Sequence, residues 1–284
     1  MLAHSTPLTS GLPPAPPPLP EPVVDAHTHL DACGATDLVG VRAALDRAAA
    51  VGVSAVVTVA DDMVAARWVV QASSWDDRVF AAVALHPTRT ATMADADRAE
   101  LERLVRQPRV VAVGETGLDY YWEYSPPPAQ QESFRRHIDL AKRLGKPLMI
   151  HDRDAHDDVL RILDEEGAPA QVIFHCFSGD AAMARCCADA GHVLSFAGPV
   201  TFRNARDLRE AAALVPEHLL LVETDAPFLT PMPHRGRPNA SRLVPHTVRA
   251  LAEVTGVELG ELCAGLTATA ERVFGSWQLD TPAG

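Results

Sequence analysis

"VVDAHTHL" (Val23–Leu30) begins as a run of β-forming residues and ends with polar side chains at alternate positions. In a β-strand, side chains two residues apart lie on the same face. Asp25, His27 and His29 would therefore all point the same way. Such a group is either part of a metal site or the polar face of an edge strand. The rest of the chain has to decide between these two interpretations.

Seven further apolar runs follow, separated by segments of helical composition. They are VSAVVTVA (53–60), VFAAVALHP (79–87), VVAVGE (110–115), PLMIH (147–151), QVIFHCF (171–177), HVLSFAG (192–198) and LLLVETD (219–225). Eight strands that alternate with helices predict a (β/α)8 TIM barrel. An open doubly wound sheet is the alternative, but the chain has no GxGxxG or GxxxxGKS/T loop. Two extra C-terminal helices, at about 244–254 and 258–274, are expected to pack on the barrel's flank.

The 284 residues divide into three parts by composition. Residues 1–22 form a proline-rich leader that we expect to be extended and disordered. Residues 23–275 would form the barrel, and residues 276–284 a tail. No apolar run approaches the roughly 20 residues that a membrane helix needs, so no membrane contact is expected. Five cysteines without a CxxC pattern favour a cytoplasmic protein over a disulfide framework or a zinc ribbon.

The net charge of −12 argues against a broad surface that coats nucleic acid. One local exception stands out, because no Asp or Glu occurs from Ala226 to Ala252. The same stretch contains Arg235, Arg237, Arg242 and Arg249. It could hold a local anion site. Nothing in the composition indicates an obligate protein partner.

Residue types that bind metals end five of the eight predicted strands. They are His27 and His29 on the first, Glu115 on the fourth, His151 on the fifth, His175 on the sixth and Asp225 on the eighth. In a (β/α)8 barrel the chemistry lies at the C-terminal ends of the strands. Four histidines and two carboxylates suit Zn or Mn, and carboxylates also accept Mg. Six ligands exceed the needs of one catalytic zinc ion, and they fit two divalent ions that share a carboxylate.

We assign His27, His29 and Asp225 to one ion, and His151 and His175 to the other, with Glu115 as the bridge. Some related barrels bridge two metals with a carboxylated lysine. The only lysines here, Lys142 and Lys146, both precede the fifth predicted strand and end none. If a bridge exists, it must then be a genuine carboxylate, and Glu115 on the fourth strand is the one placed for it.

Taken together, these residues resemble the TatD family of metal-dependent deoxyribonucleases, within the wider amidohydrolase-like barrels. The resemblance extends from about Val23 to Phe274. It rests on DAHTHL (25–30), ALHP (84–87), VGETGLDYY (113–121), IHDRDA (150–155), HCFSG (175–179) and ETDAPFLTP (223–231), followed by Arg-Gly at 235–236 and Asn239. The family commonly has Asn-x-Pro after the Arg-Gly, whereas Ala240 and Ser241 follow Asn239 here. The resemblance implies the same six metal ligands.

The expected reaction is hydrolysis of a DNA phosphodiester by a metal-activated water, in the manner of a 3′–5′ exonuclease. Single-stranded DNA or 3′ ends would be the substrate. Glu115 and Asp225 are the predicted catalytic residues, with Asp225 as the acceptor of the water's proton. Asp25 and Glu223 are predicted to lie behind the ligands, Asp25 orienting a histidine or the metal water.

Predicted substrate contacts are His86, Arg153, Arg235 and Asn239. Three of them have a structural alternative: His86 could form a His-Pro turn, Arg153 could form a salt bridge with a neighbouring aspartate, and Arg235, like Arg237, could lie in a solvated loop. Arg235 and Arg237 could meet the nucleic-acid backbone. Asp119 and the aromatic residues at 120–122 could line the cleft and stack on a base, or could cover the core.

A metal-dependent amidase or esterase is the rival hypothesis, acting on a small molecule or an aminoacyl-nucleic acid. It would use the same water but would need a clamp for a carbonyl oxygen. The acid-free arginine stretch favours the phosphodiester. A binding protein that kept the barrel without activity predicts missing ligands, but all six are present.

Overall fold

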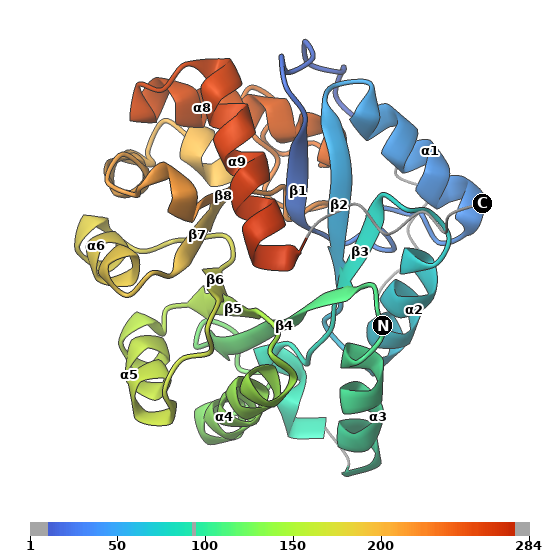
Figure 1. The fold of residues 1–284 in the computed structure, drawn as a ribbon, viewed down its shortest axis with the longest axis vertical. Coiled ribbons are helices and arrows are strands. Elements are labelled where there is room, and N and C mark those ends of the chain that lie inside the picture. The colour runs from blue at the N-terminus through green and yellow to red at the C-terminus, as the bar shows by residue number, and fades with distance from the viewer. Residues whose placement is uncertain (1–10, 93–94, 276–284) are drawn as a thin grey trace.

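The computed structural model describes residues 11–92 and 95–275. Its eight strands are β1 (Val23–Thr28), β2 (Val53–Val59), β3 (Val79–Ala82), β4 (Val110–Asp119), β5 (Leu148–Arg153), β6 (Val172–Phe174), β7 (Val193–Phe196) and β8 (Leu220–Val222). They are parallel and hydrogen-bonded in chain order, as predicted. Thr28 bridges Ala226, and the His29 N–H donates to the Ala226 carbonyl at 2.8 Å, which brings β1 to the end of β8. The predicted (β/α)8 barrel is confirmed (Figure 1).

The helices surround the strands (Figure 1). They are α1 (Leu38–Ala49), α2 (Met63–Ser73), α3 (Asp95–Val105), α4 (Pro127–Leu144), α5 (His156–Glu166), α6 (Ala181–Asp189), α7 (Arg206–Ala212), α8 (Val244–Thr255) and α9 (Leu259–Phe274). The two expected C-terminal helices are α8 and α9, and α9 packs against β1 and β8. No helix in the described ranges combines the length and apolar character needed to cross a bilayer.

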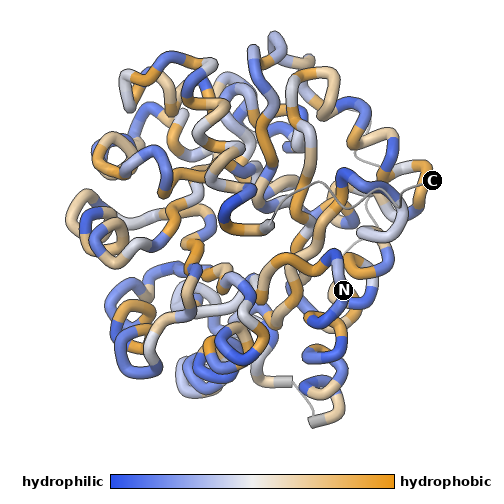
Figure 2. The backbone as a smooth tube through the Cα atoms, in the orientation of Figure 1, coloured by the Kyte–Doolittle hydropathy of each residue, from blue (hydrophilic) through white to orange (hydrophobic). Residues whose placement is uncertain are grey.

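Local sequence explains where these elements begin and end. Asp62 caps α2 by accepting hydrogen bonds from two backbone N–H groups of its first turn. Gly145 ends α4 in the left-handed conformation, with φ of 62°. The strands are apolar runs buried on both faces, as parallel strands covered by helices must be. In Figure 2 the strands are accordingly mostly hydrophobic, while each helix alternates between hydrophobic and hydrophilic residues.

The leader differs from its expected disorder in the part that the structure describes. Pro13, Pro16 and Leu19 are buried at every third position. That spacing matches a polyproline II helix, which has three residues per turn. The Leu19 N–H donates to the Val51 carbonyl at 3.1 Å, just before β2 begins. Residues 1–10 of the leader and the predicted tail at 276–284 lie outside the described residues.

Arginines of the acid-free stretch bind this leader. Arg237 donates to the Gly11 carbonyl (2.7 Å), Arg242 to that of Pro13, and Arg249 to those of Pro17 and Pro18 (3.0 and 2.9 Å). A polyproline II segment makes no internal hydrogen bonds, so its carbonyls are free to accept these donors. Arg237 is thus committed to the protein's own backbone. The charge asymmetry of this stretch therefore no longer favours a phosphate substrate.

Candidate metal centre

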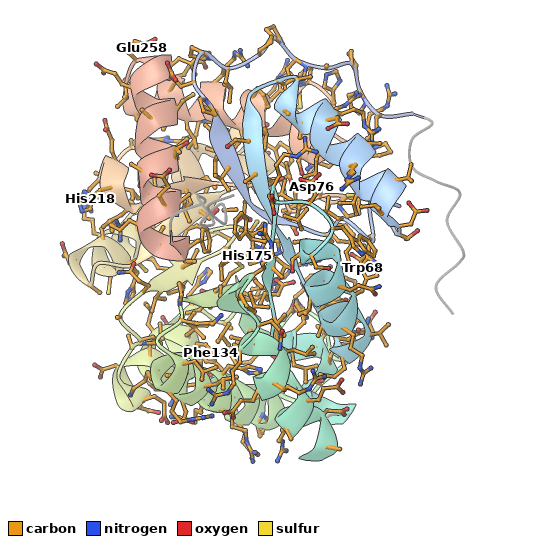
Figure 3. The ribbon with its side chains drawn as sticks, turned by 45° about the vertical axis from the view of Figure 1, so that its right-hand side comes forward. Trp68, Asp76, Phe134, His175, His218 and Glu258 are labelled. Carbon is orange, nitrogen blue, oxygen red and sulfur yellow. The ribbon has the colours of Figure 1, made fainter. Side chains whose placement is uncertain are left out.

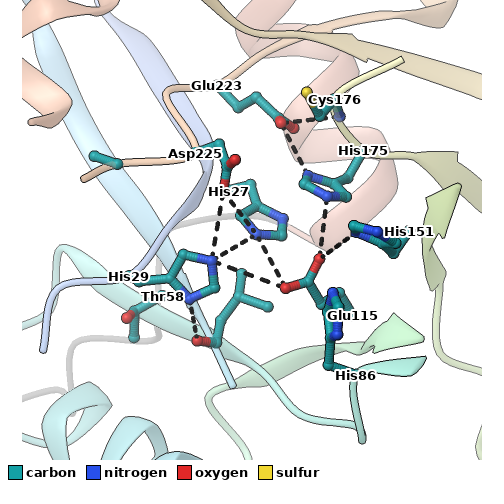
Figure 4. A network of polar contacts seen from close by, with 12 residues as sticks. His27, His29, Thr58, His86, Glu115, His151, His175, Cys176, Glu223 and Asp225 are labelled. Carbon is teal, nitrogen blue, oxygen red and sulfur yellow. Dashed lines mark hydrogen bonds and ion pairs between the residues drawn. The ribbon is translucent and has the colours of Figure 1, made fainter. Parts of the chain in front are cut away.

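The six residues predicted as ligands lie together at the C-terminal ends of the strands (Figure 4). His27 belongs to β1 and His29 follows it, Glu115 belongs to β4, His151 to β5, His175 follows β6, and Asp225 follows β8. Figure 3 labels one of them, His175, in the interior among the strands. The fold thus collects groups up to about 200 positions apart in sequence. The first cluster is defined as His27, His29 and Asp225, and the second as Glu115, His151 and His175.

In the first cluster, three ligand-type atoms face one another. Nε2 of His27 lies 3.3 Å from Nε2 of His29. Oδ1 of Asp225 lies 3.8 Å from the first nitrogen and 3.5 Å from the second. Ligands bound at about 2.1 Å to one tetrahedral ion are separated by roughly 3.4 Å. The spacing of this cluster fits a single ion.

Glu115 connects the two clusters. Its Oε2 lies 3.3 Å from Nδ1 of His151 and 3.1 Å from Nε2 of His175. Its Oε1 points the other way, 4.0 Å from Nε2 of His27 and 3.9 Å from Nε2 of His29. Each carboxylate oxygen therefore faces a different cluster, as Figure 4 shows. A carboxylate placed in this way is suited to bridging two cations.

Three of the four histidines are held by their other ring nitrogen. Nδ1 of His29 lies 3.0 Å from the Val59 carbonyl, and Nδ1 of His175 lies 3.0 Å from Oε1 of Glu223. His151 is reversed, with Nε2 at 3.0 Å from Oδ2 of Asp119 and Nδ1 facing inward. Metal-bound histidines characteristically donate their outer N–H to a carbonyl or carboxylate. Glu223 thus lies behind the ring of His175, a predicted ligand.

These outer contacts make the site difficult to satisfy without a cation. A carbonyl can only accept, so His29 donates from Nδ1 and a neutral ring presents the Nε2 lone pair to His27. In the same place, Nδ1 of His27 and Oε2 of Glu223 are buried without a hydrogen-bond partner. Buried polar atoms are rarely left this way. Neither of these two atoms faces the clusters, so the fit to divalent metal ions rests on the inward-facing ring nitrogens and carboxylate oxygens.

The ionisable groups respond to the same concentration of charge. Burial alone would raise the pKa of Glu115, but the neighbouring histidines outweigh it and hold that pKa well below its usual range. Burial opposes protonation of His29, yet the hydrogen bond to Asp225 and the charge of Glu115 raise its pKa to about 9. The carboxylates therefore stabilise positive charge at the ring nitrogens, and either a proton or a metal ion can supply that charge.

The backbone is specialised at three positions around the centre. Gly117 lies opposite His151, and a side-chain carbon there would come within 2.2 Å of the His151 carbonyl. Asp225 and Cys176 adopt left-handed conformations, with φ of 52° and 42°. In that conformation the Cys176 N–H donates to Oε1 of Glu223 at 2.9 Å, which helps to fix the carboxylate behind His175. Burial raises the pKa of the Cys176 thiol, so it stays protonated, as expected of a packing residue.

Asp25 and Asn239 support the loop after β8. Asp25 accepts from the Thr224 N–H at 2.9 Å, from the Thr224 hydroxyl at 2.7 Å and from the His27 backbone N–H at 3.4 Å, and not from a histidine ring; that it orients the metal water stays a prediction. Asn239 is buried, and its amide donates to the carbonyls of Thr224 and Phe228 at 2.9 and 2.6 Å. Its predicted substrate contact is therefore replaced by a structural role. Both side chains therefore help to position Asp225 indirectly, through hydrogen bonds to Thr224 beside it.

The other predicted substrate contacts lie at different distances from the centre. His86 joins it, with its ring centroid 4.4 Å from that of His151. The Arg153 guanidinium stacks over the Tyr121 ring at 3.9 Å and makes no ion pair with a described carboxylate, so the neighbouring-aspartate alternative is not realised. Arg235 packs over Phe202 at 4.4 Å. Of these three, only His86 touches a predicted ligand.

Two carboxylates near the centre were not predicted as parts of it. Asp119 at the end of β4 holds His151, although it had been considered only as a cleft residue. Asp61 follows β2, and burial raises its pKa, with the charge of His29 opposing that rise. Both follow the rule that chemistry collects at strand ends. Extending the rule to every acidic residue within two positions of a predicted strand end would have found Asp61, whereas Asp119 lies four positions beyond the predicted fourth strand, because β4 extends to Asp119 in the structure.

Comparisons with known proteins agree with this geometry. The family model described as "TatD related DNase" matches residues 24–275. A curated relative from Mycobacterium tuberculosis, an uncharacterized metal-dependent hydrolase TatD, is 61% identical over 89% of this chain and 98% of its own. A second curated relative, an uncharacterized metal-dependent hydrolase YabD of Bacillus subtilis, is 41% identical over 88% of this chain and 98% of its own.

Solved structures give the same answer for the fold. The crystal structure of YjjV, a TatD homologue from Escherichia coli, superposes with a TM-score of 0.83 at 27% identity. The match covers 89% of this chain and 98% of that one. A TatD family hydrolase from Entamoeba histolytica superposes with a TM-score of 0.79 at 17% identity, which is a likeness of fold alone.

Proposed function

Since the chain belongs to the TatD family of metal-dependent hydrolases, we propose that it cleaves phosphodiester bonds of DNA from 3′ ends. The observation that carries this proposal is the orientation of Glu115, whose two oxygens face two separate clusters. The family description, which names a DNase, supports DNA as the substrate. Two divalent ions, of Mg, Mn or Zn, would occupy the clusters.

The proposed ligands are His27, His29 and Asp225 for one ion and His151 and His175 for the other, with Glu115 shared. Bound there, the ions would lower the pKa of a water molecule and neutralise phosphate oxygens. The side chains of His29, Asp225 and His151 are 11%, 15% and 17% exposed, whereas that of Glu115 is 5% exposed. The substrate would therefore approach over the first three, with Glu115 beneath.

Asp225 is the proposed proton acceptor. Its Oδ1 lies beside Nε2 of His29 at the accessible side of the first cluster. As the water oxygen bonds to phosphorus, one water proton moves to this carboxylate and the bond from phosphorus to the 3′-oxygen breaks. The 3′-oxygen then takes up a proton. The products are a shortened strand with a 3′-hydroxyl and a nucleotide 5′-phosphate.

His86 and Arg153 are the proposed contacts to the substrate. His86 lies against His151, and burial lowers its pKa to about 3, so it is neutral at physiological pH. A neutral imidazole can donate one hydrogen bond to a phosphate or sugar oxygen. Arg153 carries a positive charge at the rim of the same side. Positioning of this kind supplies much of the rate in phosphoryl transfer.

A 5′-labelled single-stranded oligonucleotide tests this proposal. With Mg²⁺ or Mn²⁺ the wild-type protein should give a ladder that shortens stepwise, and a circular strand should resist. Chelator, Glu115→Gln and His151→Ala should each abolish the ladder. His156→Ala is the matched control, because that histidine pairs with Asp152 outside the clusters.

The amidase or esterase alternative is tested in the same preparation. If DNA stays intact with every metal while a cyclic amide or an aminoacyl ester is hydrolysed in a Glu115-dependent way, the nuclease proposal is wrong. Cleavage of the circular strand would instead refute the requirement for a 3′ end.

A further inference from the structure

An exposed aromatic cluster lies beside the candidate metal centre, on the segment between β4 and α4. Tyr121, Trp122 and Tyr124 are 52%, 45% and 70% exposed. Tyr121 meets Trp122 edge to face at a centroid distance of 4.9 Å, and Trp122 stacks on Tyr124 at 5.6 Å. Contiguous exposed apolar groups on a folded domain commonly mark a binding site.

These rings are not covering the core. Tyr120, the preceding residue, does pack against the core, and its hydroxyl is bonded to Asp158 at 2.7 Å. Tyr121 and Trp122 are instead about half exposed, and among the described residues neither belongs to the buried or partly buried side chains that form the core. The sequence left open whether the aromatic residues at 120–122 line the cleft or cover the core, and the structure gives different answers for different residues. Tyr120 packs against the core, whereas the exposed rings of Tyr121 and Trp122 are accessible to a ligand.

A positive charge accompanies the cluster. The Arg153 guanidinium lies 3.9 Å from the centroid of Tyr121 and 5.9 Å from that of Trp122. No ion pair joins it to a carboxylate within the described ranges, and the adjacent Asp152 is bound to His156 at 2.8 Å. Its charge thus remains available to an anionic group of a ligand.

One buried carboxylate ties the cluster to the centre. Oδ1 of Asp119 accepts from the backbone N–H groups of Tyr121 and Trp122 at 3.0 and 2.9 Å. Its Oδ2 lies 3.0 Å from Nε2 of the candidate ligand His151. Asp119 also pairs with Arg153 in the register of β4 and β5. Asp119 therefore contacts both the backbone that carries the aromatic rings and the ring of the candidate ligand His151.

We propose that Tyr121, Trp122 and Arg153 form a subsite for single-stranded nucleic acid, in which an unpaired base stacks on the rings and Arg153 holds a neighbouring phosphate. This inference rests on the proposed nuclease function, and it adds a binding site that favours unpaired over paired bases. Base stacking on aromatic side chains tolerates any sequence and requires a base that is not paired. A few local contacts of this kind also suit a chain whose net charge of −12 argues against a broad surface that coats nucleic acid.

Binding is measured in full-length Glu115→Gln, so that hydrolysis does not interfere, with an oligonucleotide carrying 2-aminopurine next to its 3′ end. Stacking should quench the fluorescence of that base. Trp122→Ala and Arg153→Ala should each weaken binding about 5- to 100-fold, while Trp122→Phe should recover most of the affinity. Blunt duplex DNA should compete poorly. Equal binding by Trp122→Ala, or equally tight binding of the duplex, overturns the subsite.

Cleavage kinetics provide a second measurement, one that would not change if Trp122 served only to stabilise the fold. In the wild type, replacing the last two nucleotides by abasic residues should raise KM by a similar factor with little change in kcat. In Trp122→Ala that replacement should have almost no further effect. If it costs the variant as much as the wild type, the subsite is wrong although the nuclease stands. If the wild type cleaves no DNA, the proposed function fails, and the fluorescence assay still decides the subsite.

Discussion

Replacement of Asp119 by Asn is expected to weaken the second cluster without disturbing the first. Oδ1 of Asp119 accepts two backbone N–H groups, so the oxygen of Asn would stay there. The amide nitrogen would then face Nε2 of His151, which has to become an acceptor. The ring proton would move to Nδ1, the nitrogen that faces Glu115 at 3.3 Å. His151 would thereby lose the lone pair with which it could bind an ion.

The magnitude follows from the loss of one orienting carboxylate. Removing such a partner typically costs 10- to 100-fold in metal affinity, or about 1.4–2.7 kcal/mol. Calorimetric titration of the metal-free protein with Mn²⁺ should show one site weakened by this factor and one unchanged. The unfolding midpoint of the variant should confirm that it is folded.

Asp152→Asn is the matched control. That carboxylate also holds a histidine, His156, at 2.8 Å, but outside both clusters. It should leave both Mn²⁺ affinities unchanged. Two sites of wild-type affinity in Asp119→Asn would refute the reasoning from the His151 tautomer.

Three further outcomes are expected. Removal of residues 1–18 should destabilise the barrel by about 2–4 kcal/mol, because three arginines lose carbonyl partners, and an unchanged urea midpoint would contradict the role of the leader. Burial lowers the pKa of His137 to about 4, below its unfolded value, so stability should fall by up to about 3 kcal/mol as pH drops from 6.5 to 4. His137→Gln should flatten that part of the pH profile, and an equal slope in the variant would exclude His137 as its source. Asp225→Asn should lower kcat at least about 100-fold with the fold intact, since Asn tolerates the left-handed φ of 52°, and normal turnover would rule out Asp225 as proton acceptor.

Much of the fold could be predicted because its signals are local. Each strand is a short apolar run, and helix ends such as Gly145 depend on residues a few positions away. The clustering of six distant residues followed from topology alone, since parallel strands in a barrel bring their C-terminal ends to one face. His27 and Glu115 could therefore be placed together without knowledge of any contact between them.

The errors concern side chains whose partners lie far away in sequence. For Arg237 a nucleic-acid contact and a solvated loop were both open, but it binds Gly11, more than 200 residues earlier. Asn239 was expected at the substrate, but its amide is used by two backbone carbonyls. Composition records that an arginine or an amide is present, whereas its partner is fixed only once the loops have packed. The same limit concealed the contact between Asp119 and His151.

The bridging position of Glu115 is tested most directly by electron paramagnetic resonance of the protein loaded with Mn²⁺, together with the measured ratio of metal to chain. The wild type should bind about two ions per chain and give the multiline spectrum of an exchange-coupled pair. Glu115→Gln should lose the coupling and bind at most one ion tightly. A wild-type protein that binds a single ion, or two ions with the six-line spectrum of isolated Mn²⁺, would contradict the account.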